Sequence, residues 1–260
     1  SIYSNDSYPW ATMDNMCEAG ISKGLKGMCF TDHIDIDYPN NEDMFNIDEY
    51  ISSINETCHK FKNRINVYKG IELGLQPHLS KKNKDISSNY DFDFILGSIH
   101  VVGRKELYGS DFVKDDTDHN GIINYFRDLK ECLSNFEDFD SLGHIDGVRR
   151  YLNNGEKYFS FEMYIDQLSE VLRMLISMGK GLELNTSGTR YGLSEYHPLT
   201  DILHLYKKLG GEIITLGSDA HKPEDIAYEF QDALSLLSKV GFQYYCIFIK
   251  RKPVYINIGQ

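Results

Sequence analysis

Acidic and imidazole side chains recur at the ends of short apolar segments in this sequence. Five of these segments end in aspartate, glutamate or histidine. The endings are Thr31-Asp32-His33, Gly70-Ile71-Glu72, Gly97-Ser98-Ile99-His100, Gly143-His144-Ile145-Asp146 and Ser218-Asp219-Ala220-His221. Imidazoles and carboxylates are the ligands expected for Zn, Mn or Fe. A single histidine at a strand end is more often structural, but five coincident endings favour one shared metal site.

Hydrolysis of a phosphate ester is the chemistry that such a site supports. Bound divalent ions lower the pKa of a water ligand, which supplies metal-bound hydroxide at neutral pH, and they neutralise charge on the phosphoryl group in transfer. Glu72 has two carboxylate oxygens and is therefore suited to bridge two ions. No residue type in the pattern marks the acid that protonates the leaving alcohol.

The apolar segments alternate with amphipathic stretches, which predicts strands and helices in turn. The expected strands cover residues 25–30, 65–71, 92–99, 141–145, 181–185, 212–217 and 242–248. The expected helices cover residues 12–23, 47–62, 120–135, 160–178, 198–209 and 223–239. The polar stretch 81–90 is expected to be a surface loop. This order predicts an α/β fold with one closed parallel barrel over residues 1–260, whose strand ends meet on the face that carries active sites.

Composition narrows the possible partners. The chain has 260 residues, 41% of them hydrophobic, and its apolar segments are far shorter than the roughly 20 residues of a membrane-spanning helix. Five cysteines without C-x-x-C spacing argue against a disulfide framework and a zinc ribbon, and no secretory signal opens the chain, so we expect a cytoplasmic protein. The net charge of -12 disfavours nucleic acid as a partner. A small phosphate ester is the expected partner.

The ordered series of endings, from Ser4 to about His221, resembles the polymerase and histidinol phosphatase (PHP) superfamily. Gly143-His144-Ile145-Asp146 followed by Arg150, and the segment 183–188 followed by Arg190, are similar to its monofunctional histidinol-phosphate phosphatases. The resemblance implies a distorted TIM-like (β/α)7 barrel with its active site at the C-terminal ends of the strands. It also implies hydrolysis of a small phosphate monoester, L-histidinol phosphate above all, in histidine biosynthesis.

The resemblance further implies roles for individual residues around two or three divalent ions. Glu72 would bridge two metals, and His100 and His144 would complete one of them. Asp219 would serve a metal otherwise held by an N-terminal His-x-His. The full set of metal ligands implied in this chain is Asp6, His33, Glu72, His100, His144, Asp219 and His221.

Arginines would bind the phosphate, since a planar guanidinium can donate two parallel hydrogen bonds to its oxygens. Arg190 is one candidate and either Arg149 or Arg150 is the other, with Arg150 favoured by the family resemblance. Asp32 and Asp146, each beside a predicted ligand, could orient a histidine ring or cap a turn.

One departure from the family pattern concerns the first residues. The family begins with a strand that ends in His-x-His, whereas Ser1-Ile2-Tyr3-Ser4-Asn5-Asp6 resembles the segment directly after that motif. We therefore expect the first strand to be absent from this chain, which would leave two exposed sheet edges. Three alternatives remain open: a PHP-type phosphodiesterase or nuclease, a protein-tyrosine phosphatase, and a decayed barrel that acts as a binding module. The acidic charge and the retained ligands weigh against the first and the last.

Overall fold

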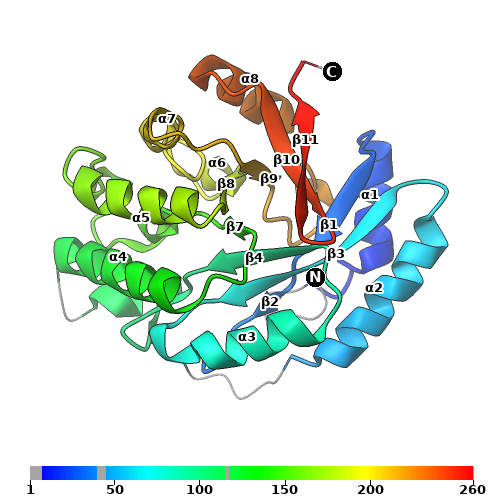
Figure 1. Cartoon of the computed structure of the whole chain (residues 1–260), viewed down its shortest axis with the longest axis horizontal. Coiled ribbons are helices and arrows are strands. Elements are labelled where there is room, and N and C mark those ends of the chain that lie inside the picture. Colours follow the sequence, from blue (N-terminus) through cyan, green and yellow to red (C-terminus); the bar gives the residue numbers. More distant parts are fainter. Residues whose placement is uncertain (1–7, 40–44, 115–116, 260) are drawn as a thin grey trace.

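The computed structural model describes residues 8–39, 45–114 and 117–259, which form an α/β fold around one large sheet (Figure 1). The strands follow one another across the sheet in the order β1 (Gly27–Phe30), β3 (Asn66–Gly74), β4 (Phe94–Ser98), β7 (Ser141–Leu142), β8 (Gly181–Asn185), β9 (Ile214–Gly217), β10 (Tyr244–Ile249) and β11 (Lys252–Asn257). Neighbours from β1 to β10 pair in parallel, β11 is antiparallel to β10, and β2 (His33–Ile34) pairs in parallel with β3. The expected strands and their parallel arrangement are confirmed.

Helices lie around the outside of the curved sheet and connect its strands (Figure 1). The α-helices are α1 (Met13–Ser22), α2 (Ile47–Phe61), α3 (Ser80–Asn89), α4 (Asp118–Asn135), α5 (Ile165–Ser177), α6 (Ser187–Arg190), α7 (Thr200–Lys208) and α8 (Phe230–Val240). Three of these helices are capped at the N-terminus by a side chain. Thr12 before α1, Asn46 before α2 and Thr117 before α4 each accept a hydrogen bond from a backbone N–H at 3.2 Å. Among the described helices, none is both long and apolar enough to cross a membrane.

Short elements complete the fold between the helices and strands. The 3-10 helices are η1 (Pro77–Leu79), η2 (Tyr108–Val113), η3 (Gly147–Tyr151), η4 (Glu156–Tyr158) and η5 (Pro223–Asp225). A small antiparallel hairpin, β5 (Val101–Val102) with β6 (Lys105–Glu106), follows β4 directly. The helix expected over 223–239 is divided into η5 and α8, and Glu229 before α8 has a left-handed φ of 51°.

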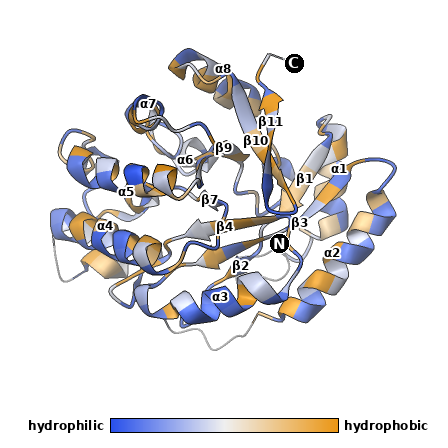
Figure 2. Ribbon diagram, in the orientation of Figure 1, coloured by the Kyte–Doolittle hydropathy of each residue, from blue (hydrophilic) through white to orange (hydrophobic). Residues whose placement is uncertain are grey.

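The prediction of a surface loop over residues 81–90 is wrong, because this stretch forms α3. Figure 2 shows α3 as a mainly hydrophilic helix, whereas α2 carries hydrophobic bands. The residues that α3 buries are polar, namely Asn83 and Ser87. Ser87 Oγ donates to Asp138 Oδ2 at 2.7 Å, and Lys84 pairs with the same carboxylate at 2.9 Å. A search for apolar periodicity cannot find a helix that is held by polar contacts.

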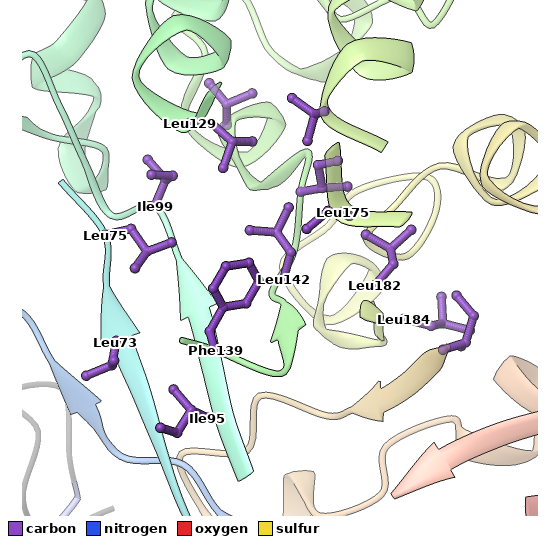
Figure 3. Close-up of a cluster of buried hydrophobic side chains, with 14 of the residues drawn as sticks. Leu73, Leu75, Ile95, Ile99, Leu129, Phe139, Leu142, Leu175, Leu182 and Leu184 are labelled. Carbon is purple, nitrogen blue, oxygen red and sulfur yellow. The ribbon is translucent and has the colours of Figure 1, made fainter. Parts of the chain in front are cut away.

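Figure 3 shows the part of the hydrophobic core that lies between the sheet and the helices α4 and α5. Its labelled side chains are each at most 1% exposed, and they are Leu73, Leu75, Ile95, Ile99, Leu129, Phe139, Leu142, Leu175, Leu182 and Leu184. Alternate residues of a strand point to opposite faces. Leu182 and Leu184 therefore face the helices, which leaves Glu183 between them on the inner face of the sheet.

The turn of the β10–β11 hairpin is bonded to the beginnings of β4 and β7. Arg251 N donates to Asp93 O at 2.9 Å, and Arg251 Nη2 donates to Asp138 O at 3.1 Å. Arg251 Nε also pairs with Asp140, whose buried carboxylate accepts Ile95 N at 2.8 Å. Burial raises the pKa of Asp140 although Arg251 opposes this shift. The last hairpin is thus fixed against the middle of the sheet.

Loss of this arginine should destabilise the fold. Arg251→Met leaves the buried Asp140 carboxylate without its cation, so we expect the free energy of unfolding to fall by about 2–4 kcal/mol. Arg64→Met is the matched control, because Arg64 pairs with Glu18 through side chains that are 49% and 51% exposed. Its effect should stay under about 1 kcal/mol in urea denaturation. Equal losses in both variants would contradict the structural role of Arg251.

Candidate metal centre and phosphate site

Four histidine rings form a continuous row at the C-terminal ends of the parallel strands. The ring centroids of His221 and His33 lie 5.7 Å apart, those of His33 and His100 5.0 Å, and those of His100 and His144 5.5 Å. His33 lies in β2, while the other three follow β9, β4 and β7. The convergence of these residues, which are far apart in the sequence, agrees with the expectation from strand polarity.

Glu72 connects three of these imidazoles. The pairing of β2 with β3 places Glu72 opposite His33, whose Nδ1 lies 3.5 Å from Glu72 Oε2. Glu72 Oε1 lies 3.2 Å from His144 Nε2 and 3.3 Å from His100 Nε2. At the far end of the row, Asp219 Oδ1 lies 3.6 Å from His221 Nδ1.

Three sets of ligand atoms in this row lie within 4.8 Å of one another. The sets are His33 with Asp35 and His100, His33 with Asp219 and His221, and Glu72 with His100 and His144. All their donor atoms are imidazole nitrogens or carboxylate oxygens, which is the donor chemistry of Zn, Mn and Fe sites. The described residues therefore fit a cluster of divalent ions that share ligands.

The structure brings together all the expected metal ligands that it describes, and Asp6 lies outside the described residues. Asp35 belongs to the same cluster but was not expected. Asp35 Oδ1 lies 2.8 Å from His100 Nδ1, and a Cβ at Gly74 would lie 2.0 Å from the same oxygen. The spacing of Asp35 from His33 was the available signal, because residues two apart on an extended segment share a face.

Opposite charges set the protonation of this cluster. Burial alone would raise the pKa of Glu72, but His33, His100 and His144 outweigh it and hold this pKa well below its usual value. Burial would likewise lower the pKa of His100, yet Asp35 and Glu72 raise it well above the ordinary value. Asp219 is buried too, and His221 and Arg150 lower its pKa to about 2. Glu72 and Asp219 are thus ionised at neutral pH.

Glu183 is a second residue that the expected set of ligands did not include. Its Oε2 accepts His144 N at 3.1 Å and Asn185 Nδ2 at 3.1 Å, so it holds the backbone that carries His144. A Cβ at Gly217 would lie 1.9 Å from Glu183 Oε1, which explains the absence of a side chain there. Burial, together with Glu72 and against the opposing effect of His144, raises the pKa of Glu183 to about 7.

Backbone strain occurs at two residues of the row. His144 has a φ of 22° and Asp219 a φ of 49°, both in the left-handed region that non-glycine residues seldom adopt. Such conformations cost about 1–3 kcal/mol and persist where surrounding contacts enforce them. Glu183 supplies such a contact for His144. Arg190 supplies one for Asp219, since its Nη1 and Nη2 donate to Ser218 O at 2.9 Å and Asp219 O at 2.6 Å.

Burial distinguishes the two neighbouring arginines. Arg149 is 2% exposed, and it pairs with Asp146 at 3.0 Å and with Glu156 at 2.8 Å. Arg150 instead faces the metal row, since its Nη2 donates to Ser187 Oγ at 2.8 Å and lies 3.7 Å from Asp219 Oδ2. The Tyr191 ring lies under its guanidinium, with 4.1 Å from Cζ to the centroid. Arg150 is therefore the arginine of this pair that can meet a ligand at the row.

Asp146 does orient a histidine, but one outside the expected ligands. Its Oδ1 lies 2.8 Å from Nδ1 of His197, which is fully buried. The His197 ring centroid lies 6.5 Å from that of His144. Asp146 also accepts Leu199 N at 2.9 Å, so it joins the segment before α7 to the strand end at β7.

A mostly parallel sheet with clustered imidazoles and carboxylates at its strand ends is the arrangement expected of a metal-dependent hydrolase. The PHP domain model matches residues 1–187, and the chain belongs to this family. The resemblance found in the sequence is thereby confirmed.

Within the family, the chain is similar to histidinol phosphatases. The probable histidinol-phosphatase of Clostridium acetobutylicum is 33% identical over 240 residues, which cover 91% of this chain and 89% of that protein. The histidinol-phosphatase of Lactococcus lactis is 33% identical over 85% of this chain and 82% of its own length. The crystal structure of the Lactococcus lactis histidinol phosphate phosphatase with zinc, L-histidinol and phosphate has a TM-score of 0.88 at 30% identity, covering 98% of this chain and 96% of that one.

Metal binding to this cluster should release protons. Because the pKa of His100 is raised, its imidazole keeps a proton at neutral pH that a metal ion must displace. The affinity for Zn²⁺ should therefore rise with pH until the raised pKa is passed, which calorimetry in buffers of different ionisation enthalpy measures directly. The His100→Gln variant should release fewer protons, whereas the control His59→Gln, an exposed residue of α2, should match the wild type. Proton release that is identical in all three proteins would contradict this protonation state.

Proposed function

We propose that this protein hydrolyses L-histidinol phosphate to L-histidinol and inorganic phosphate. The observation that carries the proposal is the row of four imidazoles, three of them next to Glu72, with Arg150 near Asp219 at its other end. Relatives that match over most of both chains bear the name histidinol-phosphatase. The similar Lactococcus lactis structure was determined with both products of this reaction and zinc.

We also propose that the protein binds two or three divalent ions. Zinc is the first choice because the Lactococcus lactis structure was determined with zinc bound. The proposed ligands are His33, Asp35, Glu72, His100, His144, Asp219 and His221, and Asp6 remains proposed from the family resemblance. When bound, such ions activate water and offset the charge of the phosphoryl group. Glu183 would keep the His144 backbone in place while this happens.

Arg150 would bind the phosphate. Its Nη2 already donates to Ser187 Oγ, which in turn donates to Asp219 Oδ2 at 3.1 Å, so the guanidinium borders the proposed metal ligands. A phosphate oxygen could replace the Ser187 contact without displacing Arg150 from the Tyr191 ring. Arg190 was expected to bind the phosphate too, and the hydrogen bonds from its two terminal nitrogens to the backbone of Ser218 and Asp219 support a positioning role for it. We therefore assign Arg190 to positioning of this strand end.

The composition supports a cytoplasmic location and a small substrate. All five cysteines are free thiols, which suits a reducing cytoplasm. The net charge of -12 suits a small ester better than a nucleic acid. We further propose that residues 1–260 act as a single domain, because the core is one cluster that extends from Ala11 to Phe242.

Loss of Arg150 should reduce catalysis and spare metal binding. Arg150→Met removes a charged phosphate contact, so kcat/KM for L-histidinol phosphate should fall about 10- to 100-fold. The wild type should prefer this substrate to p-nitrophenyl phosphate in the same steady-state assay. Arg127→Met, whose side chain is 59% exposed, is the control and should retain full activity. The substrate assignment is wrong if p-nitrophenyl phosphate is the better substrate, and the phosphate role is wrong if Arg150→Met is fully active.

A further inference from the structure

His197 is a completely buried histidine that the proposed metal and phosphate binding does not use. It precedes α7, and its backbone pairs with Asn185 at the end of β8. His197 N donates to Asn185 O at 2.9 Å, and Asn185 N donates to His197 O at 2.6 Å. Arg149 Nη1 donates to the carbonyl of the preceding residue, Tyr196, at 3.1 Å. These backbone contacts fix His197 at the same edge of the sheet as the metal row.

The contact with Asp146 determines which ring nitrogen of His197 carries the proton. Burial opposes ionisation of Asp146, but Arg149 and His197 outweigh it and lower the pKa of this carboxyl to about 2. The carboxylate can only accept hydrogen bonds, so Nδ1 of His197, 2.8 Å from Asp146 Oδ1, is the protonated nitrogen. Burial lowers the pKa of His197 although Asp146 opposes this shift, and the ring is therefore neutral. Its Nε2 is left as a hydrogen-bond acceptor.

Two buried polar atoms in this region have no hydrogen-bond partner among the residues that the structure describes. They are Nε2 of His197, an acceptor, and Nε of Arg150, a donor. Arg150 lies close enough for its charge to add to the effect of burial on the pKa of His197. The segments that carry the two residues also meet at the end of β8, one through Asn185 and the other through Ser187 Oγ, which accepts Arg150 Nη2 at 2.8 Å. Buried polar atoms that lack a protein partner are commonly satisfied by ordered water, which needs at least two polar partners.

We propose that one ordered water molecule joins Arg150 Nε to His197 Nε2, and that His197 is thereby a positioning residue for the phosphate-binding guanidinium. The water accepts from Arg150 and donates to His197. The guanidinium is then held at Nη2 by Ser187, on its face by the Tyr191 ring and at Nε by the water. A group that is oriented before its ligand arrives loses less freedom on binding. This inference rests on the proposed function, because it needs Arg150 to bind phosphate.

His197→Asn separates the roles of the two ring nitrogens. The asparagine amide can still donate to Asp146, whereas no atom of this side chain reaches the position of Nε2. We expect calorimetric binding of inorganic phosphate to the zinc-loaded protein to weaken about 3- to 10-fold, because one hydrogen bond of ordinary strength is lost. The kcat/KM for L-histidinol phosphate should fall by a similar factor, and the zinc content should stay at the wild-type level.

A double-mutant cycle distinguishes this positioning role from a purely structural one. In the Arg150→Met background, His197→Asn should change phosphate binding and kcat/KM less than about twofold, because the arginine through which it acts is gone. His197→Gln, whose amide oxygen can reach the position of Nε2, should recover most of the loss. His204→Asn, at an exposed position on α7, is the matched control and should equal the wild type. Losses that multiply in the double variant would overturn the inference, as would wild-type phosphate binding in His197→Asn.

A crystal structure of the zinc-loaded wild type tests the water directly and does not depend on the folding of any variant. We expect a water molecule within roughly 2.7–3.2 Å of both Arg150 Nε and His197 Nε2. A direct hydrogen bond from either atom to another protein group, with no such water, would overturn the inference. Failure of the wild type to hydrolyse L-histidinol phosphate would instead overturn the proposed function, and phosphate binding would still test the link between His197 and Arg150.

Discussion

A buried carboxylate surrounded by three imidazoles is the constraint on which the rest of this structure depends. Glu72 is 5% exposed, and an ionised carboxylate at such a position is very costly unless it is paired. His33, His100 and His144 provide the pairing, and each comes from a different strand end. Only a parallel sheet brings these ends to one edge. The fold and the site are thus two consequences of the same arrangement.

A second layer of contacts keeps this arrangement in place. Asp35 fixes the His100 ring, Glu183 fixes the backbone of His144, and Arg190 fixes that of Asp219. Two of these side chains need space that a methyl group would fill, and glycine is present at both of the facing positions, 74 and 217. The strained φ angles at His144 and Asp219 are sustained by these contacts. Positioning of the ligands therefore depends as much on the surrounding residues as on the ligands themselves.

The sequence allowed the sheet to be predicted well because its strands are apolar runs that end in turns, and their C-terminal ends could be identified by residue type. The same prediction from apolar patterns failed for α3, because its buried residues are Asn83 and Ser87 rather than an apolar stripe. The role of Glu183 was missed because a carboxylate that supports a ligand has no spacing rule of its own, whereas the signal for Asp35, its spacing of two from His33, was present but not used. The family resemblance favoured Arg150 over Arg149, but the physical reason for this choice is burial, and the proposed role of Arg190 rests on its backbone contacts; neither is encoded locally.

The shared metal site is tested most directly by anomalous diffraction from crystals of the zinc-loaded protein. At least two anomalous peaks should lie in the row of histidines, with nitrogen and oxygen ligands at roughly 2.0–2.2 Å. One of those peaks should be bound by Glu72 together with His100 and His144, and another by His33. Zinc bound elsewhere on the protein, with no peak within bonding distance of Glu72, would contradict the shared metal site.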